Sequence, residues 1–281
     1  MSRYPGQEGA VPGALGYYDL GITPYFALQT DPRFSYCLYV PRTAPEGGYR
    51  LVVAVHGTAR TAEAYRDAFA GFAEEHGALM LAPLFPAGIE GPGDLSGYKL
   101  LRSGGIAYDR LLLDMVAEVG ARYPLRAGGF LLHGFSGGGH FAHRFLMAHP
   151  QHLAGVSIGA PGIVTLPDPT VDWWAGVRNF ATIFGHPPDL SAISKVAVHL
   201  CVGAQDTETW EITLEPGDGW WMEGGAWQAH ANRIARATRL AQALRDLGCA
   251  VRFDLVPGAA HDGAAMIPCV RDWMAGLIAG R

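Results

Sequence analysis

The stretch HGFSGGGHF, residues 133–141, decides how this chain folds. Apolar residues typical of a buried strand precede it, and a helical pattern follows it. Each glycine in a helix costs roughly 1 kcal/mol relative to alanine, so a run of glycines at a helix start needs a reason. The segment GFSGG has the form G-x-S-x-G around Ser136, which is typical of a nucleophile elbow between a strand and a helix. In such a turn the glycines leave room for a strained serine whose hydroxyl stands clear of the sheet.

The same glycines also fit a second pattern. Gly137, Gly139 and Ala142 match the dinucleotide-binding pattern G-x-G-x-x-G/A. A dinucleotide site needs an acidic residue at the end of the next strand to hold a ribose, but that strand is expected to end in IGAPG, residues 158–162. No GK[ST] triplet occurs, which excludes a phosphate-binding P-loop. The nucleophile elbow is therefore the better interpretation.

Strands and helices are expected to alternate along the chain. Segments 17–28 and 34–40 are expected to form an antiparallel pair joined by the turn TDPR. Further strands are predicted by the apolar runs LVVAVHG, ALMLAP, GGFLLHGF, LAGVSIG, KVAVHLCVG and AVRFDLVPG. Helices are predicted over 61–77, 109–123, 137–149, 228–247 and the C-terminal segment. This alternation predicts one α/β domain over residues 1–281, with a mostly parallel sheet of about eight strands and helices on both faces.

Three segments interrupt the alternation: 86–105, 161–194 and 206–227. Each follows the carboxyl end of a strand, where open α/β sheets bind ligands, so we expect them to form a lid and a substrate pocket. Most of the tryptophans lie in the last two segments. We expect some of them to line an apolar pocket, while packing within the segments is the alternative. The pocket candidates are Trp173, Trp174, Trp220 and Trp221.

Two further residues complete a catalytic triad in the order serine, acid, histidine. Asp206 follows the strand KVAVHLCVG, and His261 follows the last strand. A histidine at that place reaches Ser136 as general base and then general acid, and a carboxylate orients its ring. Glu208 and Asp172 are the alternative acids.

An oxyanion hole needs two hydrogen-bond donors. We expect one to be the N–H of Gly137, the residue after the nucleophile, and the other to be the N–H of Thr58 in the turn after LVVAV. Neighbouring histidines are expected to be structural, because base and nucleophile normally come from different loops; these are His56, His133, His140 and His143.

Composition restricts the remaining function classes. The net charge is −5, and the basic residues cluster only at Arg233, Arg236 and Arg239, whose spacing predicts a solvated helix face, so a nucleic-acid partner is excluded. No apolar run is long enough to span a membrane, and the N-terminal residues lack the apolar core of a signal peptide. We therefore expect a cytoplasmic protein. Only Lys99 and Lys195 are lysines, which together with the alanine and glycine content indicates a GC-rich bacterial genome.

The cysteines are Cys37, Cys201, Cys249 and Cys269. None lies in a C-x-x-C motif, so neither a zinc site nor a thioredoxin-type site is indicated, and we expect no metal and no cofactor. Reduced core thiols are expected, with a Cys249–Cys269 disulfide as the alternative.

With these motifs the chain resembles the α/β-hydrolase family over nearly its whole length. The segment VVAVHGTARTAEAYRD followed by LMLAPLFPAG is similar to the dienelactone-hydrolase and polyhydroxybutyrate-depolymerase-like branch. The resemblance implies a cofactor-free serine hydrolase with Ser136 as nucleophile, His261 as base and Asp206 as acid. Ser136 departs from the cysteine nucleophile of dienelactone hydrolases. The extracellular depolymerases of the family carry signal peptides and binding domains that are not visible here.

We therefore expect a hydrolase that cleaves a small-molecule or oligomeric carboxylic ester through an acyl-enzyme. The same triad also performs amide or peptide cleavage and acyl transfer, which are the alternatives within the enzymes. A non-catalytic binding protein on this scaffold is expected to carry a broken triad. The sequence does not indicate the oligomeric state.

Overall fold

The computed structural model describes residues 15–280. In this part of the chain the central sheet has nine strands, in the order β1-β3-β5-β4-β8-β9-β10-β11 with β2 paired to β3. The parallel strands are β5 (Ala78–Leu84), β4 (Arg50–Val55), β8 (Phe130–Phe135), β9 (Leu153–Gly159), β10 (Ala197–Gly203) and β11 (Val251–Val256). The antiparallel strands at one edge are β1 (Gly21–Ile22), β2 (Phe26–Ala27) and β3 (Ser35–Val40). The mostly parallel sheet expected from the sequence is confirmed.

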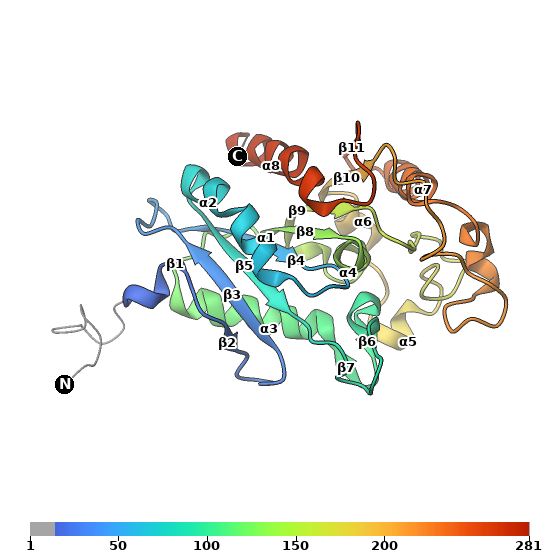
Figure 1. Cartoon of the computed structure of the whole chain (residues 1–281), viewed down its shortest axis with the longest axis horizontal. Coiled ribbons are helices and arrows are strands. Elements are labelled where there is room, and N and C mark those ends of the chain that lie inside the picture. The colour runs from blue at the N-terminus through green and yellow to red at the C-terminus, as the bar shows by residue number, and fades with distance from the viewer. Residues whose placement is uncertain (1–14, 281) are drawn as a thin grey trace.

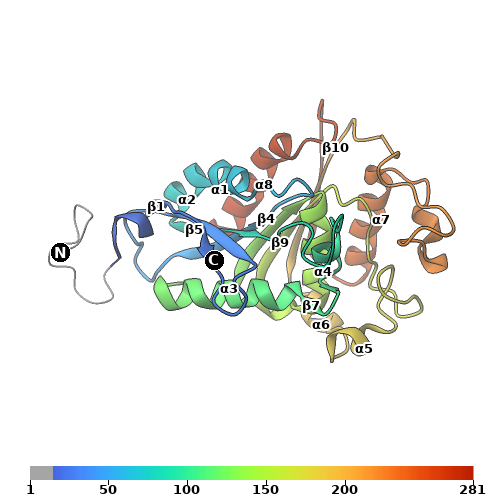
Figure 2. The ribbon, with the colours of Figure 1, turned by 60° about the horizontal axis from the view of Figure 1, so that its bottom comes forward.

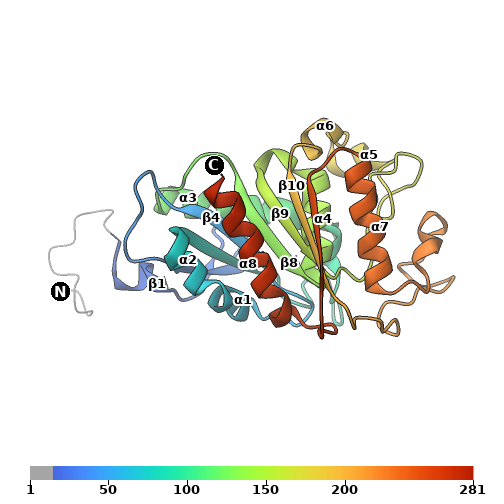
Figure 3. The same cartoon turned by 90° about the horizontal axis from the view of Figure 1, so that it is seen from above.

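Helices cover both faces of the sheet (Figures 1 and 2). One face carries α1 (Ala62–Ala68), α2 (Ala70–His76) and α8 (Gly263–Ala279), and α8 lies across the strands beside α2 (Figure 3). The other face carries α3 (Tyr108–Arg122), α4 (Gly137–Ala148) and α7 (Arg233–Asp246). The shorter elements are the pair β6 (Arg102–Ser103) and β7 (Ile106–Ala107), with α5 (Phe180–Phe184) and α6 (Leu190–Ile193).

The centre of the sheet is a rigid platform because its strands are buried on both faces. Val52 and Val53 in β4 and Leu131 and Leu132 in β8 all contribute to the main core. Every residue of α4, the helix that begins at the elbow, is buried as well. A strand that is buried on both faces needs consecutive apolar residues, so the apolar runs in the sequence predict these strands.

The N-terminal segment differs from its predicted strand over 17–28. A short 3₁₀ helix occupies Tyr17–Asp19, and β1 and β2 are separate two-residue strands that both pair with β3. Pro24 lies between them and has no N–H to donate to a strand ladder, which explains the interruption.

Two predicted helices also have different bounds. The helix over 61–77 is divided into α1 and α2 at Phe69, whose dihedral angles are φ −100° and ψ 0°. The helix over 228–247 begins only at Arg233, because the Asn232 side chain accepts a hydrogen bond from the Ala235 N–H and caps the helix there.

None of the helices within residues 15–280 is long and apolar enough to cross a membrane. The cytoplasmic location stays a prediction.

Candidate active site

Ser136 occupies a strained turn between β8 and α4. Its dihedral angles, φ 55° and ψ −113°, are rare for a residue with a side chain. The Ser136 N–H donates to the Gly159 carbonyl over 2.8 Å, and the His140 N–H donates to the Ser136 carbonyl over 3.0 Å. These contacts with β9 and α4 hold the backbone in the conformation that a nucleophile elbow requires.

The glycines around Ser136 are required by close backbone contacts. A Cβ atom on Gly134 would collide with the Gly138 carbonyl, and one on Gly138 would collide with the Val55 carbonyl of β4. A Cβ atom on Gly139 would collide with the Gly159 carbonyl at the end of β9. The turn is therefore packed against two neighbouring strands, and the third glycine, which the motif leaves unexplained, has a steric reason of its own.

The structure brings Ser136, His261 and Asp206 together. His261 Nε2 lies 3.0 Å from Ser136 Oγ, and His261 Nδ1 lies 2.7 Å from Asp206 Oδ2. In this arrangement Nδ1–H donates to the carboxylate, and Nε2 accepts from the serine hydroxyl. The ring of Phe135 lies 4.7 Å from the His261 ring and packs against it. The alternative acids are elsewhere, since Asp172 pairs with Arg178 and Glu208 is exposed.

Arg233 is a residue of the site that the sequence analysis missed. Its Nη1 lies 3.2 Å from Asp206 Oδ1, and its Nη2 lies 2.9 Å from Glu211 Oε2. The side chains of Arg233 and Asp206 are only 4% and 1% exposed, so the guanidinium compensates a buried carboxylate.

The predicted solvated helix face is wrong for Arg233 and Arg236, which are buried, whereas Arg239 is exposed as predicted. Arg236 is fully buried and donates to the carbonyl groups of Gly162, Ile212 and Gln228. Arg239 lies over the Trp227 ring, 4.1 Å from its centroid. The spacing of the arginines is that of a helix face, but loops cover Arg233 and Arg236, and no local pattern in the sequence indicates that cover.

Gly137 and Thr58 lie close to each other beside Ser136. A Cβ atom on Gly137 would stand 3.1 Å from the Thr58 nitrogen, and both residues line the same cavity. Neither N–H has an acceptor within the described part of the chain. The turn that carries Thr58 is held by His56, whose Nδ1 donates to the Gly57 carbonyl over 2.8 Å and whose Nε2 accepts from the Phe85 N–H over 3.0 Å.

The histidines flanking the elbow have structural contacts, as expected. His140 Nε2 accepts the N–H groups of Gly162 and Ile163, and His143 Nε2 accepts the Thr165 N–H over 3.0 Å. Complete burial lowers the pKa of both imidazoles well below 6.5. These neutral rings fix the start of the 161–194 segment onto α4.

A cavity of about 1040 Å³ opens above Ser136. Residues of all three interrupting segments line it, among them Ser96, Lys99, Ile163, Ile212, Leu214 and Trp220. Of the four tryptophans expected in a pocket, only Trp220 lines this cavity among residues 15–280, and Trp210, which is largely exposed, joins it.

The other candidate tryptophans pack inside the interrupting segments, which corrects the expectation for Trp173, Trp174 and Trp221. Trp173 contacts Phe180 and Phe184. Trp174 is buried and, like Trp221, belongs to a small apolar cluster around Ile163 and Leu214. The fully buried Arg144 lies below Trp173 and Trp174 at 5.7 Å and 5.9 Å. Most of these aromatic side chains therefore stabilise the cavity wall from behind.

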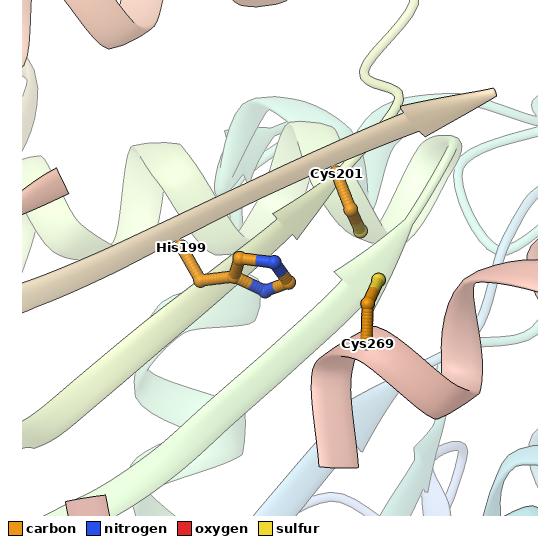
Figure 4. Close-up of side chains that lie close together, drawn as sticks. All are labelled: His199, Cys201 and Cys269. Atoms are coloured by element: carbon orange, nitrogen blue, oxygen red, sulfur yellow. The ribbon is translucent and has the colours of Figure 1, made fainter. Parts of the chain in front are cut away.

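One group of side chains has the composition of a metal site. The ligand atoms of His199, Cys201 and Cys269 lie within 4.8 Å of one another between β10 and α8 (Figure 4). However, His199 Nδ1 pairs with the Ser157 hydroxyl over 2.9 Å, and its Nε2 pairs with Asp254 over 3.1 Å. Because both ring nitrogens are already hydrogen-bonded, the imidazole has no free lone pair for an ion. The group also does not line the cavity above Ser136.

All four cysteines are free thiols. The structure has no Cys249–Cys269 disulfide, and the reduced state in solution stays a prediction.

The comparisons with known proteins rest on structure. No family model matches the chain, and no curated protein matches it in sequence. A poly(3-hydroxybutyrate) depolymerase from Bordetella parapertussis is similar, with 25% identity, a TM-score of 0.69, and coverage of 86% of this chain and 84% of that chain. A poly(aspartic acid) hydrolase from Sphingomonas sp. KT-1 has 20% identity, a TM-score of 0.68, and coverage of 85% and 92%. An S-formylglutathione hydrolase from Agrobacterium tumefaciens has 17% identity, a TM-score of 0.54, and coverage of 88% and 90%. These similarities confirm the fold that the sequence predicts.

Proposed function

We propose that this chain, which has the α/β-hydrolase fold, is a serine hydrolase that cleaves carboxylic esters through an acyl-enzyme intermediate. The observation that carries the proposal is the hydrogen-bonded row from Ser136 through His261 to Asp206 at the carboxyl ends of the strands. The similarity to a polyester depolymerase supports an ester as the substrate.

The geometry supports the following first half-reaction. Ser136 Oγ attacks the carbonyl carbon while His261 Nε2 takes the hydroxyl proton. The buried Asp206 carboxylate stabilises the imidazolium and holds its tautomer. The N–H groups of Gly137 and Thr58 bind the oxyanion of the tetrahedral intermediate. When this intermediate collapses, the bond to the alkoxy oxygen breaks, and the alcohol leaves with the proton from His261.

Water completes the reaction, with His261 again acting first as base and then as the acid that returns the proton to Ser136 Oγ. His261 takes a proton from a water molecule, whose oxygen attacks the acyl carbon, and the bond to Ser136 Oγ breaks. The acid product leaves, and the serine regains its proton. An alcohol in place of this water gives acyl transfer, so the acceptor that enters the cavity decides between hydrolysis and transfer.

The cavity above Ser136 is proposed as the substrate pocket, with segments 86–105, 161–194 and 206–227 as its walls and lid. Its lining includes Ile163, Ile212, Leu214 and Trp220, which favours an apolar acyl or alcohol group. The large volume also admits an oligomeric ester.

Matched nitrophenyl esters and nitroanilides test the proposed reaction. We expect the purified chain to hydrolyse the esters and Ser136→Ala to lose this activity by at least about 10³-fold. The variant Ser191→Ala, which removes an exposed serine of α6, is the matched control and should retain activity. Turnover of anilides without turnover of esters would contradict the ester assignment, and equal activity of Ser136→Ala would contradict the whole mechanism.

A further inference from the structure

Lys99 is a cation in the wall of the cavity, directly beside the proposed oxyanion donors. It lies in the 3₁₀ turn Gly97–Leu100, in the first of the interrupting segments. A Cβ atom on Gly137 would stand 3.1 Å from Lys99 Cε and 3.1 Å from the Thr58 nitrogen. The lysine stem therefore passes along the same side of Gly137 as the Thr58 N–H.

The ammonium group has few partners. Lys99 Nζ donates to Ser96 Oγ over 3.2 Å, and no carboxylate pairs with it in the described part of the chain. A lysine ammonium has three donors, so this contact leaves donors for a ligand, and Lys99 lines the cavity. An anion that entered the cavity would satisfy these donors with a charge-assisted hydrogen bond.

The surroundings of Lys99 are more positive than negative. Burial and, to a smaller extent, the charges of Arg60 and Arg144 lower its pKa to about 8, against the opposing effect of Asp94 and Glu211. The amine is thus mostly charged at neutral pH but poorly solvated. A bound carboxylate would relieve both the desolvation and the repulsion from the two arginines.

The turn that carries Lys99 is held in place before any ligand arrives. Arg144 Nη1 donates to the Lys99 carbonyl over 2.6 Å. Asp94 Oδ1 accepts the Ser96 and Gly97 N–H groups over 2.9 Å and 3.0 Å, and Arg60 Nη2 donates to the Leu95 carbonyl. Because the binding groups are already ordered, little conformational entropy is lost when an anion binds.

The position also indicates which part of the substrate Lys99 meets. His261 protonates the leaving alcohol, so the alcohol side of the ester faces His261. Lys99 lies beside the proposed oxyanion donor Gly137, on the side of Gly137 that faces the Thr58 nitrogen. The acyl part of the ester is the part that extends away from the leaving group.

We propose that Lys99 Nζ and Ser96 Oγ form a subsite for a carboxylate on the acyl part of the substrate. Esters of dicarboxylic acids that keep one free carboxylate are then the preferred substrate class. This inference rests on the proposed function, because it assumes that Ser136 attacks the ester carbonyl.

Two esters of matched size test the subsite. Mono(4-nitrophenyl) glutarate and 4-nitrophenyl pentanoate differ in whether a carboxylate or a methyl group ends the acyl chain. We expect wild type to prefer the glutarate, and Lys99→Met to lower the ratio of kcat/KM for glutarate to that for pentanoate by about 10- to 100-fold. Lys99→Arg should keep most of the ratio, and Lys195→Met, which removes an exposed lysine, should keep all of it.

The pH dependence of the same ratio is a second readout that needs no variant. Because Lys99 is charged below its pKa of about 8, the wild-type preference for glutarate should fall as the pH rises through that value. In Lys99→Arg the preference should persist above it. A ratio that stays constant across this pH range would overturn the subsite.

The remaining outcomes separate the two proposals. Turnover that depends on Ser136 with a ratio unchanged in Lys99→Met would overturn the subsite and leave the proposed function standing. Turnover that does not depend on Ser136 would overturn the proposed function itself. In a second pair, 4-acetoxybenzoate and phenyl acetate, the first ester carries the carboxylate on the alcohol side. If only this pair responds to Lys99→Met, the acyl-side assignment is wrong.

Discussion

Arg233→Met removes the cation that compensates the buried carboxylate of the triad. The Arg233 and Asp206 side chains are almost fully enclosed, and Nη1 lies 3.2 Å from Oδ1. Loss of one partner from a buried ion pair costs about 3–5 kcal/mol, mainly because the other charge stays buried without its counter-ion. The second ion pair of Arg233, with the half-exposed Glu211, adds little. We therefore expect the free energy of unfolding to fall by about 3 kcal/mol, the lower end of that range, since His261 still donates to Asp206.

Urea unfolding of three further variants separates charge compensation from packing. Arg233→Met/Asp206→Asn should be more stable than Arg233→Met alone, because the double variant leaves no uncompensated charge. Arg239→Met, on the same helix, should lose about 1 kcal/mol or less, since its cation–π contact with Trp227 is at the surface. Arg233→Lys should be more stable than Arg233→Met, because it keeps a cation beside Asp206. A loss below about 1 kcal/mol in Arg233→Met, or a double variant no more stable than the single one, would refute this account of Arg233.

The remaining predictions concern the elbow, a thiol and buried histidines. Gly139→Ala should lower both the melting temperature and the esterase activity, because the new Cβ collides with the Gly159 carbonyl. Gly276→Ala in α8, where a Cβ meets open space, should instead stabilise the protein by about 0.5–1 kcal/mol. Equal effects of the two variants in differential scanning calorimetry would contradict this packing argument. Iodoacetamide near neutral pH should modify Cys269 first, because contacts with Cys201 and His199 lower the pKa of its thiol, whereas burial raises the pKa of Cys37 to about 11. Uniform labelling in peptide mass spectrometry would count against this. Burial lowers the pKa of His56 to about 4 and of His133 to about 3, so below pH 6.5 the unfolded chain takes up protons that the folded chain does not. The free energy of unfolding should therefore be lower at pH 5 than at neutral pH by about 2 kcal/mol per histidine. Urea midpoints that do not change with pH over this range would contradict the prediction.

The sequence predicts the parallel part of the sheet well because those strands are buried on both faces. Such burial requires unbroken apolar runs, and β4 and β8 have them. The elbow can also be predicted from the sequence, since the close contacts at Gly134 and Gly138 leave no room for a side chain and therefore require glycine. Both features are local consequences of packing, so a short stretch of sequence carries them.

The features that the sequence did not predict depend on how distant segments meet. Trp173 and Trp220 have the same local signal, an aromatic residue in a long loop, but only Trp220 reaches the cavity. Arg233 and Arg236 have the spacing of a solvated face, and only the cover supplied by other loops makes them buried. Helix periodicity predicts which side of the helix a side chain lies on, but it does not predict which distant segments cover that side.

Labelling with a fluorophosphonate, followed by peptide mass spectrometry, is the most direct test of whether Ser136 is an activated nucleophile. Such a probe reacts with a serine hydroxyl only where a base and an oxyanion hole activate it. We expect one adduct on Ser136 in wild type, and its loss in His261→Ala, in which the serine remains but its base is gone. An unlabelled wild type, or an adduct at another serine, would contradict the assignment of Ser136 as the nucleophile.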